Sequence, residues 1–293
     1  MTWENYYLPS SAGEVLELLD SYHGGARLIA GGTDLMVQHR QDPLEVQALV
    51  DISGVSEFST IREENGRIYV GAAVTHSQLE ESPLIKQKGS VLAQAARTVG
   101  SPQIRNMGTL GGNVVNAQPA ADTAIALLAL DACVHVLTSQ GETEKSLEDT
   151  FIGPGESAVD STREVVKAFS FAATETTQKS VFMRFARRQA LALPVINLGI
   201  WIQHKEPHHL QDVRIAAGPM SRVPLRARET EKMLRGNPLE EAVLEQAVQT
   251  ITKEVTPRDS FRGGSSYKKK LVGVFLRRAL LEAMEEKGVE QNG

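Results

Sequence analysis

The stretch that most constrains the fold covers residues 108–122 and reads GTLGGNVVNAQPAAD. Gly111 and Gly112 have no Cβ, so the backbone there can take positive φ and turn its N–H groups toward a closely approaching anion. The apolar segment AADTAIALLALD follows. It predicts a helix with Pro119 and Asp122 in its first turn, where the helix dipole favours negative charge. The pattern is typical of a loop that holds phosphate.

A second glycine loop strengthens this interpretation, because an isolated glycine pair marks an ordinary turn more often than a binding site. Residues 28–34 read LIAGGTD, and Leu35 and Met36 then open a predicted helix. Neither loop fits GxGxxG or GxxxxGK[ST], so a Rossmann dinucleotide fold and a P-loop are both unsupported. Two glycine loops on separate segments can hold one pyrophosphate from two sides.

The composition predicts a soluble globular protein, since the 293 residues are 41% hydrophobic and 23% charged. The net charge of −5 provides no basic field, so we expect no nucleic-acid partner. The first residues lack the basic and apolar regions of a signal peptide. The longest apolar run, residues 124–130, is far too short to cross a bilayer. We therefore expect a cytoplasmic protein without membrane insertion.

Cysteine and histidine usage argues against a metal centre in this chain. Cys133 is the only cysteine, and a four-thiolate iron–sulfur cluster needs four. Its expected role is that of a small buried hydrophobe rather than a reactive thiol. His204, His208 and His209 form a weak zinc candidate, but Pro207 and the neighbouring charges fit a solvated turn better. We expect neither a metal site nor a catalytic acid, base or nucleophile.

The first half of the chain predicts alternating helices and short strands. Ser11 and Glu14 have the spacing of a capping box, and residues 28–30 and 48–52 predict strands of a small, mostly parallel sheet. Residues 67–74 predict another strand, and residues 90–99 a longer helix. Thr75 is a predicted cap for a short helix. His76 is then expected to be exposed at its start.

The second half changes to a period of two, which predicts antiparallel sheet in the segments CVHVLTS, REVVKAFSF and VFMRFARR. Residues 194–203 and 213–217 predict a hairpin, and the remaining third is helical. A polar stretch at residues 174–178 predicts a domain boundary. Lys268, Lys269 and Lys270 are expected on a solvated or intersubunit face.

Three segments together resemble a known family, the FAD-binding medium subunit of the molybdenum hydroxylases, which include xanthine dehydrogenase and carbon monoxide dehydrogenase. They are AGGTD at residues 30–34, IRNMGTLGGN at residues 104–113, and the Ala117, Pro119 and Asp122 pattern that follows. The presence of AGGTD rather than AGGHS favours the xanthine dehydrogenase branch. Chain length and layout also agree with the family.

The resemblance implies an α+β fold in two domains. Residues 1–175 are expected to form a two-part FAD-binding domain of the PCMH type, with a small mostly parallel sheet and a larger antiparallel or mixed sheet with helices. Residues 176–293 are expected to form a C-terminal domain of a three-stranded antiparallel sheet and helices.

The resemblance also implies which residues meet FAD. The expected contacts are Leu28, Ile29, Ala30, Gly31, Gly32, Thr33, Asp34, Leu35, Thr109, Leu110, Gly111, Gly112, Asn113, Asp122, Val165, Phe182 and Met183. Asp122 is expected to close the site, and Leu35 to lie near the isoalloxazine. Met183 stands where many relatives carry a lysine. Either Arg184 or Arg187 replaces that charge, or the flavin edge is less stabilised.

By the same resemblance, the function is electron transfer by FAD within a heterotrimer. A substrate is hydroxylated at the molybdenum cofactor of a molybdopterin subunit, and electrons pass through 2Fe-2S clusters on an iron–sulfur subunit. FAD on this chain then passes them to NAD or another acceptor. Two alternatives stay open: a free-standing FAD-dependent oxidoreductase, and a flavin-free assembly subunit, against which the intact glycine loops argue.

Overall fold

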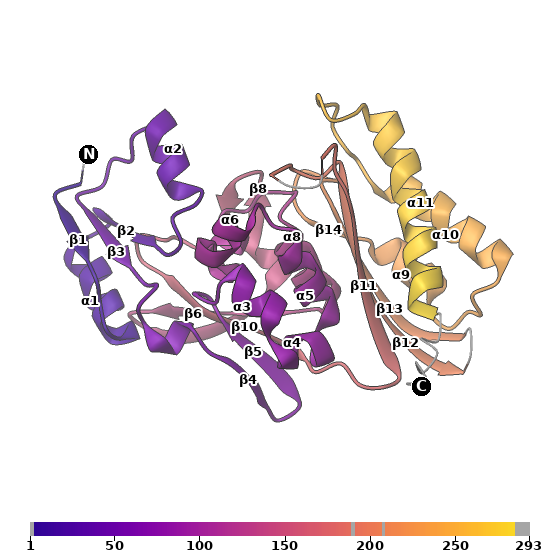
Figure 1. Cartoon of the computed structure of the whole chain (residues 1–293), viewed down its shortest axis with the longest axis horizontal. Coiled ribbons are helices and arrows are strands. Elements are labelled where there is room, and N and C mark those ends of the chain that lie inside the picture. Colours follow the sequence, from indigo (N-terminus) through magenta and orange to yellow (C-terminus); the bar gives the residue numbers. More distant parts are fainter. Residues whose placement is uncertain (1–2, 189–190, 207–208, 285–293) are drawn as a thin grey trace.

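Three main β-sheets follow one another along the molecule, from the N-terminal end to the C-terminal helices (Figure 1). The structure is a computed structural model that describes residues 3–188, 191–206 and 209–284. One parallel and two antiparallel sheets, each with helices, confirm the expected α+β class. In the described residues no helix has the length and apolar character that a bilayer span requires.

The first sheet is parallel, as expected, and places the first glycine loop at the end of a buried strand. Its order is β1 (Asn5–Tyr7), β3 (Ala48–Asp51), β2 (Ala26–Ile29), and its helices are α1 (Ala12–Ser21) and α2 (Leu35–Gln41). Ser11 caps α1 by accepting the Glu14 N–H. The Glu14 carboxylate accepts the N–H of Ser10 rather than that of Ser11, so only half of the expected capping box forms.

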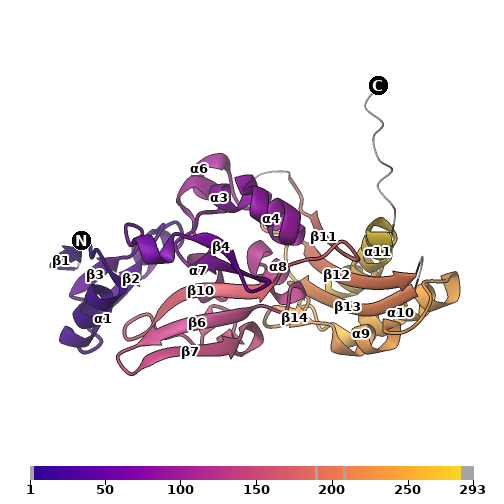
Figure 2. The same ribbon diagram turned by 90° about the horizontal axis from the view of Figure 1, so that it is seen from below.

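The second sheet is antiparallel and is covered by helices on one face only (Figure 2). Its strands, in spatial order, are β4 (Ile61–Glu64), β5 (Arg67–Gly71), β10 (Val165–Ala172), β6 (Cys133–Thr138) and β7 (Gly141–Ser146). The associated helices are α3 (His76–Glu81), α4 (Pro83–Lys88), α5 (Ser90–Arg97), α6 (Pro102–Met107), α7 (Leu110–Val115) and α8 (Asp122–Ala129). Short elements η1 (Ser56–Phe58), η2 (Leu147–Thr150), β8 (Phe151–Gly153) and β9 (Glu156–Ser157) complete this part.

Cys133 begins β6 and is half-buried, so the expected burial of its side chain is only partial. Side chains alternate along the strand, and Cys133 lies beside Val134, which points into the core. Partial burial and the neighbouring Glu144 carboxylate raise the pKa of the Cys133 thiol. The thiol therefore has little thiolate character, which agrees with the expected lack of reactivity.

The third sheet contains one strand more than expected. Its antiparallel order is β11 (Gln178–Phe185), β12 (Ile196–Glu206), β13 (His209–Gly218) and β14 (Leu225–Arg226). The hairpin of β12 and β13 is confirmed, whereas the two residues of β14 are too few to give a sequence pattern. Helices α9 (Arg228–Leu234), α10 (Glu241–Glu254) and α11 (Ser265–Met284) follow, and α11 covers β11 and β12 (Figure 1).

The VFMRF run forms an antiparallel strand, as its period of two predicts, and pairs with β12 in the third sheet. Two other sequence expectations for this part are corrected or limited. Lys268 is only 3% exposed, so it does not belong to a solvated face. His208 lies outside the described residues, among which no group of three metal-ligating side chains occurs.

Helix α8 joins the second and third parts of the molecule. All eight of its residues are buried, because α5 covers one side and strands β12 and β13 another. At its first residue, the Asp122 carboxylate accepts from Arg184 Nε at 3.1 Å and from Asn197 Nδ2 at 2.6 Å. At its other end, Arg226 donates to Leu128 O at 3.2 Å. The helix dipole favours a cation at this carbonyl end. Because Arg184, Asn197 and Arg226 lie on strands of the third sheet, these bonds connect both ends of α8 to that sheet.

Candidate cofactor site

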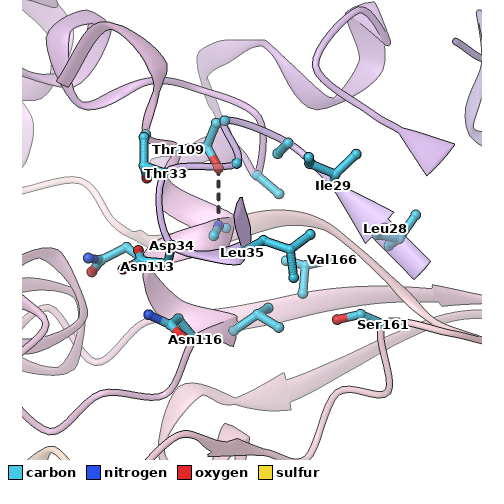
Figure 3. A pocket seen from close by; sticks show the side chains of 18 of the residues that line it. Leu28, Ile29, Thr33, Asp34, Leu35, Thr109, Asn113, Asn116, Ser161 and Val166 are labelled. Carbon is cyan, nitrogen blue, oxygen red and sulfur yellow. Dashed lines mark hydrogen bonds between the residues drawn. The ribbon is translucent and has the colours of Figure 1, made fainter. Parts of the chain in front are cut away.

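The two glycine loops face each other across a cleft between the first and second sheets (Figure 3). The free space, with the open mouth included, is about 1170 Å³.

The first loop follows β2 and contains two glycines with different physical roles. A Cβ on Gly31 would lie 1.8 Å from the carbonyl oxygen of Met107, so only glycine allows the loop to approach the end of α6. Gly32 has a φ of +66°, a conformation that side chains disfavour. The loop is thereby pressed against the segment that leads into the second glycine pair.

The first loop presents a row of free donors. In the described part of the chain, the backbone N–H groups of Gly32, Thr33, Asp34 and Leu35 have no protein acceptor. They stand at the start of α2, and Thr33, Asp34 and Leu35 surround the cleft (Figure 3). Successive unpaired N–H groups at a helix start form a binding site for an anion such as phosphate.

The second loop is different, because it forms the short helix α7. Thr109 caps this helix by accepting the Gly112 N–H at 3.1 Å (the dashed line in Figure 3), and Gly111 donates to Ala72 O at 2.8 Å. Neither glycine has positive φ. The expectation that Gly111 and Gly112 turn their N–H groups toward an anion is therefore wrong, because a capped helix already uses both groups.

The two glycines of α7 allow close approach on opposite sides. A Cβ on Gly111 would lie 2.7 Å from Ala72 Cβ, within the protein core. Gly112 is exposed and lines the cleft, where a Cβ would meet only Thr109 Oγ1 at 3.1 Å. Gly111 is thus required for packing, and Gly112 leaves room for a ligand.

Asparagine side chains provide the polar surface of α7. Asn113 Oδ1 accepts the Thr123 hydroxyl at 2.7 Å, while its Nδ2 group has no acceptor in the described chain. Asn116 Oδ1 accepts from Gln38 Nε2 at 3.0 Å, which links α7 to α2. The Thr123 bond fixes the amide of Asn113, so a donor lies at the cleft opposite the first loop (Figure 3).

His76 lies at the inner wall of the cleft and is 2% exposed, so the expected exposure is wrong. Thr75 and Gln78 do form the capping box that starts α3. However, the backbone N–H of His76 donates to Gly108 O at 3.0 Å, and Gly108 lies against the imidazole ring. Burial, reinforced by the charge of Arg105, lowers the pKa of His76 to about 4. The ring is therefore neutral at pH 7.

Most of the residues predicted to meet FAD line this cleft. They are Leu28, Ile29, Ala30, Gly31, Gly32, Thr33, Asp34, Leu35, Thr109, Gly111, Gly112 and Asn113. Partial burial raises the pKa of the Asp34 carboxyl. The contact of each residue with FAD stays a prediction.

Five predicted residues do not line the cleft: Leu110, Asp122, Val165, Phe182 and Met183. The side chains of Leu110 and Val165 are buried in the cores, and Val166, the neighbour of Val165, takes its place on the cleft wall. Phe182 and Met183 lie on β11 in the third sheet. Resemblance by sequence position does not distinguish a residue from its neighbour on the opposite face of a strand.

The charge expected near the flavin is also differently placed. Arg184 is paired with Asp122, and Arg187 donates to Phe261 O at the surface. Burial raises the pKa of the Asp122 carboxyl, and the charge of Arg184 opposes this effect. Neither arginine lines the cleft, and a role for either one beside the flavin stays a prediction.

Several cleft residues were not predicted from the sequence. Arg27 lies on β2, and Ser161 and Glu164 come from the segment before β10. Ser161 is held there because its carbonyl accepts the Leu28 N–H at 3.0 Å. No local motif marks these positions, and only the pairing of distant segments brings them to the cleft.

The geometry agrees with comparisons to known proteins. Residues 2–171 match the family described as the FAD binding domain in molybdopterin dehydrogenase, and residues 181–283 match the CO dehydrogenase flavoprotein C-terminal domain. The chain belongs to this flavoprotein family. The resemblance inferred from the sequence is thereby confirmed, together with FAD as the cofactor of the matched domain.

Relatives and solved structures match over nearly their whole length. The FAD subunit of nicotinate dehydrogenase from Eubacterium barkeri is 31% identical, covering 92% of this chain and 93% of the relative. A putative xanthine dehydrogenase FAD-binding subunit from Escherichia coli (strain K12) is 27% identical, covering 97% of both. A carbon monoxide dehydrogenase structure from Hydrogenophaga pseudoflava has a TM-score of 0.90 at 25% identity, covering 96% of this chain and 97% of that one. These relatives represent different branches, so membership of the xanthine dehydrogenase branch stays a prediction.

Proposed function

We propose that this chain binds one FAD non-covalently in the cleft and relays electrons within a molybdenum hydroxylase complex. The electrons arrive from 2Fe-2S clusters on an iron–sulfur subunit, after hydroxylation at a molybdopterin subunit, and leave to an acceptor such as NAD. The observation that carries the proposal is the row of free N–H groups from Gly32 to Leu35, opposite the exposed Gly112.

In this proposal the chain binds and orients the cofactor and excludes water. The four N–H groups of the first loop hold the pyrophosphate, and Asn113 Nδ2 donates from the other side. Leu35 and Val166 form apolar wall along the cleft. FAD, when bound, supplies the redox chemistry, and no side chain of this chain acts as acid, base or nucleophile.

The partner subunits follow from the chemistry that this chain lacks. Its single cysteine cannot ligate a four-thiolate cluster, which supports an electron donor on another chain. We also propose that the FAD-binding domain spans residues 1–175 and the C-terminal domain residues 176–293. Strand β10 ends at Ala172 in the second sheet, and β11 begins at Gln178 in the third, which supports this division.

Cofactor analysis tests the first part of the proposal. We expect the purified chain to show flavin absorbance, about one FAD per chain, and to release FAD on denaturation. No flavin absorbance after reconstitution with FAD would overturn the proposal, and flavin retained on the denatured chain would exclude non-covalent binding.

Flavin reduction tests the relay. In the native complex, we expect the hydroxylated substrate to bleach the flavin only when the iron–sulfur subunit is present. Equally fast bleaching of the isolated, FAD-loaded chain would instead identify a free-standing flavoenzyme.

A further inference from the structure

An exposed surface of aromatic, leucine and arginine side chains lies at one end of the third sheet, and we call it the Phe–Arg surface. Its apolar members are Phe185, Leu191, Leu193 and Phe261, and cations of the same surface include Arg187 and Arg262. The segment between α10 and α11 protrudes at this end of the sheet, near the end of β11 (Figure 1). Exposed apolar groups that gather in this way mark interaction sites.

The most prominent part of this surface is a tight turn. Ser260 and Gly263 exchange backbone hydrogen bonds of 3.2 and 3.0 Å, which leaves Phe261 and Arg262 at the tip. Phe261 is 79% exposed, and the Arg262 guanidinium lies 4.6 Å from the centre of its ring. A phenylalanine in this position has no role in the core of the described chain.

A buried lysine holds the turn from below. Lys268 Nζ donates to Arg258 O at 2.6 Å and to Ser260 Oγ at 3.0 Å. Burying an ammonium group is costly unless it is hydrogen-bonded, so Lys268 has a fixed partner set rather than a solvated role. Asp259, the one carboxylate of residues 258–264, accepts the Ser265 N–H. The tip is therefore presented on a rigid base, which lowers the entropy cost of binding.

The Phe–Arg surface adjoins the cofactor cleft. Arg187 Nη1, beyond the end of β11, donates to Phe261 O at 3.1 Å and connects the turn to the sheet. Farther along, the Leu191 N–H donates to Gly100 O at 3.2 Å. Gly100 follows Val99, which lines the cleft. The surface is therefore linked to the cleft wall at Leu191, and such a position suits an electron donor because the rate of electron transfer falls steeply with distance.

The charge of the surface indicates the chemistry of the partner. Arg187, Arg188 and Arg258 are exposed here, although the whole chain has a net charge of −5. Arginine and aromatic residues are enriched at protein interfaces, and opposite charge steers association. We propose that the Phe–Arg surface docks the iron–sulfur subunit through an acidic, partly apolar face of that subunit. The inference rests on the proposed function and adds the place where the electron donor binds.

Binding of the FAD-loaded chain to the isolated iron–sulfur subunit tests the proposal. We expect Phe261→Ala to raise the dissociation constant about tenfold or more, since an exposed aromatic anchor dominates many interfaces. Arg262→Glu is expected to weaken binding at low salt and to reduce its dependence on ionic strength. Matched controls are Leu8→Ala, at a leucine just after β1 that is 74% exposed, and Lys253→Glu at an exposed lysine of α10. Flavin content and thermal stability should be unchanged in all four variants.

Several outcomes would overturn the docking surface. They are wild-type affinity in both Phe261→Ala and Arg262→Glu, equal loss in the two controls, or binding of the molybdopterin subunit alone to this surface. Absence of any complex between the wild-type chain and the iron–sulfur subunit would do the same. A flavin-free wild-type chain that still loses the iron–sulfur subunit on Phe261→Ala would instead refute the electron relay and keep the docking surface.

Discussion

Gly111 and Gly112 are neighbours in α7, yet alanine at the two positions is expected to have opposite effects. At position 111, the new Cβ lies 2.7 Å from Ala72 Cβ and 2.8 Å from Ala72 O, inside the usual contact distance of about 3.5–4.0 Å. Overpacking costs about 1–3 kcal/mol, and loss of the 2.8 Å bond from Gly111 N–H to Ala72 O costs about 1 kcal/mol. Better helix propensity returns about 1 kcal/mol. The net expectation is a destabilisation of about 1–3 kcal/mol.

At position 112, the same methyl group has space in the protein but not beside a ligand. Its nearest atom is Thr109 Oγ1 at 3.1 Å, so small movement of the capping hydroxyl accommodates it. Gain in helix propensity offsets this strain, and we expect stability within about 1 kcal/mol of wild type. The methyl group projects into the cleft, so FAD affinity should fall about tenfold, which corresponds to about 1.4 kcal/mol.

Two measurements on the apoproteins separate these effects. Thermal unfolding reports stability, with about 2–4 °C expected for each kcal/mol in a chain of this size. Titration of flavin fluorescence reports the dissociation constant. Unchanged FAD affinity in Gly112→Ala would show that α7 does not face the cofactor. A Gly111→Ala variant as stable as wild type would refute the packing role of Gly111.

Two further substitutions test buried charge and a buried imidazole. Arg226→Met leaves the Glu231 carboxylate, which is 1% exposed, without its cation. We expect the free energy of unfolding, measured in urea, to decrease by about 3–5 kcal/mol, and the double variant Arg226→Met/Glu231→Leu to recover most of it. For His76, the ring in the unfolded chain binds a proton below about pH 6.5, whereas the buried ring in the folded chain binds one only near pH 4. The free energy of unfolding should therefore decrease as the pH is lowered from about 6.5 to 4, by up to about 1.4 kcal/mol per pH unit. His76→Gln should fall less steeply, and equal slopes would show that the buried ring takes up the proton.

Local conformation was predictable from the sequence wherever neighbouring residues decide it. The strand, turn and helix around Gly32 follow from residues 28–36, and Thr75 caps its helix through Gln78, only three residues away. The hairpin of β12 and β13 follows from its period of two. For the Thr75 cap and the hairpin, the hydrogen-bond partner lies in the same segment or in the next one along the chain.

Features decided by distant segments were not predictable in the same way. Burial of His76 depends on Gly108, and the need for glycine at position 111 depends on Ala72. Lys268 is buried because Arg258 and Ser260 fold back over it. Their residue types fit exposed positions equally well, so only the packed structure reveals what each one contacts.

Complete burial of α8 has a consequence for the synthesis of the chain on the ribosome. The helix ends at Ala129, but β12, which covers part of it, begins about 70 residues later at Ile196. At about 5–20 residues per second, this delay lasts roughly 4–14 s. During that time an apolar helix surface of the nascent chain has no covering strands. Chaperones that bind nascent chains therefore have a defined segment to protect, and it belongs to the half of the protein that is made first.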